Sequence, residues 1–213
     1  LILPKFFLEN CGAYLAAIRS IGRTEEYFYM PVFESAAMIP PQTRREALTE
    51  VRAQLDTVSG SILNIRVGGN DLSHAFGLRR PANRTIYDLR PVADILIDIV
   101  AAFGTQYVVS GPVWEYYSGE GWEEGLRREM ELDLLNGFTG KTVIHPNQIP
   151  VVNEMLRVSQ RDYADARAIL NWDTGSGSLV SASEDGGRMN EYNTHSRWAR
   201  RIVLRAERYG VRA

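Results

Sequence analysis

The ten residues GKTVIHPNQI, from Gly140 to Ile149, are the most informative stretch of this sequence. Residues 141–144 read as a short strand, and Pro146 then stands near the start of a helix, where its missing N–H costs little. His145 follows the expected strand directly, at the edge where α/β proteins bind their ligands. Lys141, inside the stretch, is one of only two lysines, against 22 arginines. The stretch therefore predicts a strand end beside a ligand site.

Short apolar runs alternate with longer helical patterns on the N-terminal side of this stretch. The runs predict strands over residues 1–8, 27–34, 61–67, 106–110 and 141–144. The apolar stripes and their flanking Pro and Gly residues predict helices over residues 11–21, 42–58, 91–103, 121–136 and 147–170. Strand–helix alternation repeated five times predicts an α/β fold with a parallel sheet.

The composition changes after Trp172. Residues 173–187 are rich in Gly and Ser, which predicts a flexible linker or lid. Residues 189–209 then read as a basic amphipathic helix that ends at Gly210. We therefore divide the chain into a barrel part (1–172), a linker (173–188) and a helical arm (189–213) that is free to pack on a neighbouring subunit.

Composition and charge narrow the possible functions. The 213 residues are 45% hydrophobic and carry a net charge of −2, so there is no electrostatic footprint for nucleic acid or an acidic membrane. No apolar run approaches about 18 residues, so we expect no transmembrane helix. The single cysteine, Cys11, excludes an internal disulfide and fits a cytoplasmic protein.

Two carboxylates follow neighbouring predicted strands. Glu34 ends the second strand, and Asp71 follows the third after Gly68 and Gly69. Mg²⁺ is usually held by one or two carboxylates, with water and substrate oxygens as its other ligands. Glu34 and Asp71 are therefore our candidate metal ligands, and the two glycines would let a substrate approach the backbone closely.

Each of these residues also has a structural explanation. Glu34 could pair with Arg66, and Asp71 could cap the following turn. His145 before proline is more often a structural histidine, and Lys141 could bond a loop carbonyl. Such pairings would leave the strand ends without a chemical role.

Other reactive side chains leave further alternatives open. Lys5 after Pro4 could form a Schiff base, as in metal-free aldolases. Cys11 falls on a helical pattern and is expected in the core. Arg79, Arg80 and Arg84 are equally suited to binding phosphate or carboxylate and to a solvated surface.

These motifs together resemble the HpcH/HpaI aldolase and citrate lyase β-subunit superfamily. The region from Trp172 to Gly210 looks most similar to a bacterial subgroup of C–C bond lyases of TIM-barrel fold, which is linked to tellurium-resistance and stress gene clusters. In order along the chain, the matching segments are LPK (3–5), FES (33–35), GGNDL (68–72), VSGPV (109–113), GKTVIHPNQI (140–149) and GRMNE (187–191).

The resemblance implies a (β/α)8 barrel that cleaves or forms a carbon–carbon bond with Mg²⁺, or alternatively Mn²⁺, at Glu34 and Asp71. It implies an oxo or hydroxy acid, or its CoA-type thioester, as substrate, and a trimer or hexamer. Glu191 would be the acid donated to a neighbouring subunit. Our candidate catalytic residues are Glu191, Lys5 and His145, and our candidate substrate contacts are Gly68, Gly69, Asn70, Pro112 and Lys141.

The resemblance places the first predicted strand at the fourth strand of the barrel. Five strands cannot close an eight-stranded barrel, so we expect roughly 80–120 further residues upstream in the complete protein. Two alternatives to the metal-dependent lyase stay open. One is a Schiff-base aldolase that uses Lys5, and the other is a non-catalytic scaffold module of a stress-response complex.

Overall fold

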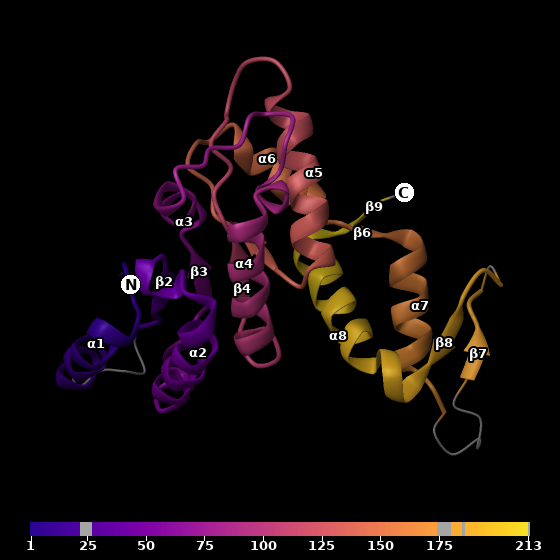
Figure 1. Ribbon diagram of the computed structural model, residues 1–213. Helices are drawn as coiled ribbons and strands as arrows, with labels where there is room; N and C mark the ends of the chain where they lie inside the picture. Colours follow the sequence, from indigo (N-terminus) through magenta and orange to yellow (C-terminus); the bar gives the residue numbers. More distant parts are fainter. Residues whose placement is uncertain (22–26, 174–179, 185, 213) are drawn as a thin grey trace. The chain divides into compact units, whose positions relative to one another are not determined.

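A computed structural model describes residues 1–21, 27–173, 180–184 and 186–212. The chain divides into two compact units, Leu1–Val152 and Asn153–Ala213 (Figure 1). The predicted linker falls partly on residues 174–179 and 185, which lie outside the described residues. The predicted three-part division stays a prediction. Within the described residues, no helix combines the length and the apolar character needed to cross a membrane.

The first unit is built on a five-stranded parallel sheet whose strands neighbour one another in chain order. This arrangement confirms the parallel α/β fold predicted from strand–helix alternation. The strands are β1 (Ile2–Leu3), β2 (Met30–Phe33), β3 (Ile65–Val67), β4 (Val109–Gly111) and β5 (Gly140–Lys141).

Helices connect successive strands of the sheet, and one further helix follows the last strand. Pro41 and Pro91 stand in the first turns of their helices, where a missing N–H is not needed. The helices are α1 (Leu8–Ser20), α2 (Pro41–Asp56), α3 (Gly69–Ala75), α4 (Arg90–Phe103), α5 (Trp122–Leu135) and α6 (Gln148–Met155). Three short 3-10 turns also lie here, η1 (Ala36–Met38), η2 (Ser59–Ser61) and η3 (Ile86–Asp88).

An aromatic cluster fills the space between the sheet and these helices. Phe33 at the end of β2 packs edge-on against Phe103 of α4, with ring centroids 5.1 Å apart. Phe6 and Phe7, which connect β1 to α1, both pack against Phe33. These rings are fully or almost fully buried, so the ends of β1 and β2 are held firmly where Lys5 and Glu34 follow them.

The second unit is mainly helical. Helices α7 (Gln160–Leu170) and α8 (Tyr192–Tyr209) pack side by side around a small core of their own (Figure 1). Strand β6 (Val158–Ser159) pairs in parallel with β9 (Val211–Arg212), and β7 (Val180–Ala182) forms an antiparallel hairpin with β8 (Met189–Glu191).

Several predicted strands are shorter in the structure. The first spans only Ile2–Leu3, because Lys5 adopts a left-handed backbone (φ 49°) and α1 begins at Leu8. The last spans only Gly140–Lys141, and Ile144 beyond it is 53% exposed, with its N–H donated to the Gln148 side chain. Hydrogen bonds within the loops therefore replace the strand pairing that was expected beyond these short strands.

The long helix predicted over residues 147–170 is wrong. Helix α6 ends at Met155, Val158 pairs with Val211 near the C-terminus, and Ser159 caps α7 by accepting a bond from the Asp162 N–H. The helix predicted over residues 189–209 begins only at Tyr192, because the three residues before it pair with β7. Long-range strand pairing thus overrides local helical periodicity at both places.

Candidate functional site

Glu34 and Asp71 line the same cavity at the carboxyl ends of β2 and β3. Glu34 follows β2 directly, and Asp71 lies in the first turn of α3, just after β3. The cavity has a volume of about 250 Å³. Its lining residues are Lys5, Glu9, Glu34, Ser35, Ala36, Asp71, Leu72, His74 and Ala75.

The Glu34 carboxylate is held by backbone on two sides. Its Oε1 accepts a 3.0 Å bond from the Lys5 N–H. Its Oε2 lies so close to Gly68 that a Cβ on that residue would fall less than 3.0 Å from it. Only a glycine leaves room for the carboxylate, so Gly68 serves Glu34 directly.

Lys5 lies on the same cavity and has a fixed backbone. Its N–H is donated to Glu34, and its carbonyl accepts a 2.6 Å bond from the Asn10 side-chain amide. A left-handed backbone is uncommon for a residue with a side chain. These two bonds hold the turn that brings Lys5 to the cavity, as the aldolase alternative requires.

Two acid–base residues of the cavity were not predicted from the sequence. Glu9, in the first turn of α1, accepts a 2.5 Å bond from Ser35 Oγ, and Ser35 also caps η1. His74 lies one helical turn after Asp71. Two sequence features could have pointed to them. Glu9 is an acid at the start of the helix after the first strand, and His74 is spaced three residues from Asp71, which places both on one helix face.

The other residues around Asp71 are packed by protein atoms. A Cβ on Gly69 would lie 2.6 Å from both Ile86 Cδ1 and Pro112 Cβ. The Asn70 Oδ1 is buried and accepts no hydrogen bond from the described residues. Gly68 and Gly69 therefore make room for Glu34 and Pro112, and the contacts predicted from Gly68, Gly69, Asn70 and Pro112 to substrate stay predictions.

Lys141 lies against helix α5, within a buried ionic network. Its Nζ lies 2.7 Å from both Glu129 Oε1 and Asp133 Oδ2 of helix α5, and its side chain is fully buried. Glu129 also pairs with Arg80, and Asp133 accepts a bond from Tyr87. Burial raises the pKa of Asp133, and the Lys141 ammonium opposes that rise. The substrate contact predicted for Lys141 stays a prediction.

His145 lies in a separate cluster from Glu34 and Asp71. Its ring stacks on Tyr117 at 4.3 Å between centroids, and its Nδ1 accepts a 3.2 Å bond from the Asn147 N–H. The Asn147 side chain in turn bonds the Tyr117 carbonyl. These contacts match the structural alternative, and a catalytic role for His145 stays a prediction.

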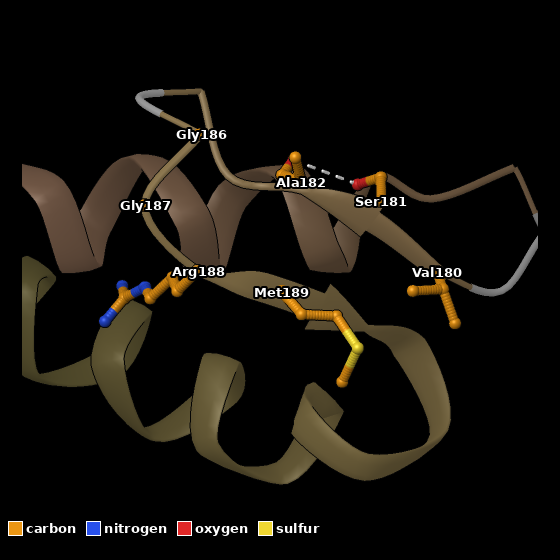
Figure 2. A pocket seen from close by; sticks show the side chains of 7 residues that line it. All are labelled: Val180, Ser181, Ala182, Gly186, Gly187, Arg188 and Met189. Atoms are coloured by element: carbon orange, nitrogen blue, oxygen red, sulfur yellow. Dashed lines mark hydrogen bonds between the residues drawn. The ribbon is translucent and has the colours of Figure 1, made fainter.

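Glu191 belongs to the second unit, at the end of β8. Its N–H is donated to His195 Nδ1. The hairpin that carries it borders an open hollow of about 450 Å³, with Val180 and Met189 on one side of the hairpin and Ser181 on the other (Figure 2). Arg188, next to Met189, pairs with Asp162 and Asp165 of α7. The transfer of Glu191 to a neighbouring subunit stays a prediction.

The arginines considered for anion binding pair with acids of the protein. Arg79 pairs with Glu115, buried Arg80 with Glu129, and Arg84 with Asp88. Cys11 is buried in the core, as expected. Burial is the main reason that its pKa is raised, which disfavours the thiolate.

The donor set of the cavity fits a hard divalent cation. Glu34 and Asp71 offer carboxylate oxygens. Because Gly68 has no side chain, the Glu34 Oε2 can lie beside it. The described residues contain no group of three or more His, Cys, Asp or Glu placed to hold a metal. Two protein carboxylates with water and substrate oxygens are a common arrangement for Mg²⁺ and an uncommon one for zinc.

Comparison with known proteins establishes the family. Residues 1–211 match the family described as C–C bond lyase of the TIM-barrel fold. The chain belongs to this family. The match confirms both the predicted barrel fold and the superfamily resemblance.

Individual relatives cover the chain unevenly. Over 74 residues it is 38% identical to the L-malyl-CoA/β-methylmalyl-CoA lyase of Cereibacter sphaeroides, a match that covers 34% of this chain and 22% of that enzyme. CitE of Mycobacterium tuberculosis, solved with magnesium, acetoacetate and coenzyme A, is 22% identical, with a TM-score of 0.65 over 97% of this chain and 67% of its own. A citrate lyase of Burkholderia xenovorans LB400 is 16% identical, with a TM-score of 0.69 over 100% of this chain and 64% of its own. The chain thus spans about a fifth of the curated relative and about two thirds of the solved structures, and these structures support the fold alone.

Proposed function

We propose that the chain is the cation-binding part of a Mg²⁺-dependent lyase that cleaves or forms a carbon–carbon bond in an oxo or hydroxy acid or its CoA thioester. The observation that carries the proposal is the convergence of Glu34 and Asp71 on one cavity, with Gly68 making room for the Glu34 carboxylate. Membership of the C–C bond lyase family supports it, as does the malyl-CoA lyase relative.

Under this proposal each residue has a defined task. Glu34 and Asp71 would hold Mg²⁺, which polarises a carbonyl and stabilises negative charge on its oxygen during bond cleavage. The Lys5 N–H holds Glu34 Oε1 in place by a hydrogen bond, and Glu34 Oε2 lies beside Gly68. Glu191 of a second copy would move the proton of the substrate hydroxyl, which requires an oligomer such as the trimer or hexamer that the family resemblance implies.

Metal binding tests the proposal most directly. We expect the full-length protein to bind Mn²⁺, used as a paramagnetic substitute for Mg²⁺, and the Glu34→Gln/Asp71→Asn variant to lose that binding in electron paramagnetic resonance. Glu46→Gln, an exposed position on α2, is the matched control and should bind normally. Equal Mn²⁺ affinity in the double variant would contradict the metal site. Loss of assembly in that variant, with no lyase activity in the parent protein, would favour the scaffold alternative.

A Schiff-base aldolase is the second candidate, because Lys5 lines the same cavity. Borohydride reduction in the presence of pyruvate would then attach the keto acid covalently to Lys5. Mass spectrometry of the digested protein decides between the two chemistries. A metal-dependent lyase gives no adduct at Lys5, and a Schiff-base aldolase gives one that Lys5→Met abolishes.

A further inference from the structure

Arg66 projects from β3 toward the face of the sheet opposite the helices. Its neighbours Ile65 and Val67 are 0% and 3% exposed and belong to the core between the sheet and the helices. Because successive side chains of a strand point to opposite faces, Arg66 lies on the inner face of the sheet. A long basic side chain there has no packing role in the helical layer.

The strand register shows how far the Arg66 side chain reaches. Arg66 lies beside Val32 on β2 and beside Ser110 on β4, and Ser110 lies beside Gly140. The Arg66 Nε donates a 3.4 Å bond to Thr142 Oγ1, two residues beyond Gly140. The four paired residues form one row across the sheet, and the guanidinium extends from this row toward the carboxyl ends of the strands.

Glu34 and Gly68 stand at the same level as Thr142. Phe33 lies beside Val67, so the next residues along β2 and β3 are Glu34 and Gly68. Each is two residues beyond the row that contains Arg66, as Thr142 is two residues beyond Gly140. The guanidinium thus reaches the level at which the candidate cation site begins.

The guanidinium keeps most of its hydrogen-bonding capacity. Arginine has five N–H donors, and the bond to Thr142 uses one of them at 3.4 Å, which is longer than the usual range of about 2.7–3.2 Å. No carboxylate of the described residues lies within 4.0 Å of Arg66, whereas Arg79, Arg80 and Arg84 each pair with one. The pairing with Arg66 that was the structural alternative for Glu34 is therefore absent from the described part of the chain.

We propose that Arg66 binds a second carboxylate of the substrate, the one remote from the cation. The proposal rests on the lyase function proposed above. Guanidinium and carboxylate match in geometry and charge, and the two N–H groups on one edge can bond both carboxylate oxygens. A substrate held by the cation at one end and by Arg66 at the other is a dicarboxylic hydroxy or oxo acid. Arg66 thus selects dicarboxylic over monocarboxylic acids.

L-malate and L-lactate provide the test, because both are 2-hydroxy acids and only malate has a second carboxylate. Their affinities are measured by calorimetry on the full-length protein with saturating Mg²⁺, for the wild type, Arg66→Gln, Arg66→Lys and the exposed control Arg45→Gln. Mn²⁺ affinity is measured in parallel. A hydrogen-bonded charge pair corresponds to about 10- to 100-fold in affinity.

We expect Arg66→Gln to weaken malate binding by about 10- to 100-fold, with lactate and Mn²⁺ affinity changed by less than about twofold. Arg66→Lys should recover part of the loss, and Arg45→Gln should match the wild type. Equal losses for malate and lactate, or no loss, would overturn the role of Arg66. A wild type that does not prefer malate also overturns it, whereas a wild type that binds no Mn²⁺ refutes the cation site instead.

Discussion

Gly68 is the residue that gives the Glu34 carboxylate its space. We predict that Gly68→Ala displaces Glu34, because the added Cβ would meet both the Cβ and the Oε2 of that side chain. Overpacking of this kind costs roughly 1–3 kcal/mol in the free energy of unfolding. Mn²⁺ affinity should fall at the same time, and both quantities can be measured by urea denaturation and paramagnetic resonance.

Gly60→Ala is the matched control for this change. A Cβ on Gly60 would meet no atom within 4 Å, and its φ is not positive. Replacement should leave Mn²⁺ affinity unchanged and alter stability by less than about 1 kcal/mol. A normal Mn²⁺ affinity in Gly68→Ala would mean that Glu34 does not bind the cation.

Lys141 neutralises two buried carboxylates, so its removal should be costly. Lys141→Met leaves Glu129 and Asp133 facing one another with one cation fewer, and breaking a buried pair costs about 3–5 kcal/mol. Arg79→Met breaks an exposed ion pair and should cost at most about 1 kcal/mol. Urea denaturation of the two variants measures both values. A loss as small as that of Arg79→Met would show that the network adds little.

The loss of unfolding free energy in Lys141→Met should depend on pH, and the sign of this dependence can be predicted. Burial already raises the pKa of Asp133, and the variant lacks the ammonium that opposes this rise. A carboxyl whose folded pKa lies above its unfolded value, about 3.9, stabilises the protein below that value and loses this contribution as pH rises through the folded pKa. The deficit should therefore be smallest near pH 4 and grow toward neutral pH. A deficit independent of pH would show that Asp133 does not titrate in this range.

The candidate site residues were predictable to different degrees. Glu34 and Asp71 follow neighbouring parallel strands, and the carboxyl ends of such strands meet at one edge, so local sequence was enough to bring them together. The partners of Lys141 come from helix α5, and sequence periodicity does not show which helix face meets which strand. Glu9 was missed for the same reason, because its position depends on how α1 packs.

At the scale of elements, prolines, glycines and apolar stripes located most helices, but helical periodicity did not reveal where a helix breaks. Pro91 marked the start of α4 and Gly137 the end of α5, and the apolar stripe over residues 42–58 predicted α2. The helix expected over residues 147–170 had suitable periodicity and still breaks, because β6 pairs with a strand near the C-terminus. Such pairings are fixed by the tertiary fold and leave little trace in a local pattern.

Ser159 marks the start of α7 and provides a test of this break. Its Oγ accepts a 3.1 Å bond from the Asp162 N–H, which satisfies one of the free donors at the helix start. We predict that Ser159→Ala lowers stability by about 1 kcal/mol. Ser181→Ala, at an exposed position on β7, should change it by less than about 0.5 kcal/mol. Equal effects in urea denaturation would show that the cap does not stabilise α7.

At the scale of the whole molecule, both candidate metal ligands fall in one compact unit. Glu34 and Asp71 belong to the unit of residues 1–152, which has an aromatic and aliphatic core of its own. The second unit has a separate small core between α7 and α8. A cation held by Glu34 and Asp71 should therefore stabilise the first unit and leave local opening of the second unchanged.

Hydrogen exchange with and without Mg²⁺ measures this difference across the chain. A ligand that binds only the folded state at about 100 times its Kd adds about 2.7 kcal/mol, which slows exchange through opening of its own unit by about 100-fold. We predict slower exchange in β2, β3 and α3, with α7 and α8 unchanged, and no response in Glu34→Gln/Asp71→Asn. Glu46→Gln should respond as the wild type does. Equal protection of both units, or protection that persists in the double variant, would show that Mg²⁺ acts elsewhere than at the carboxyl ends of β2 and β3.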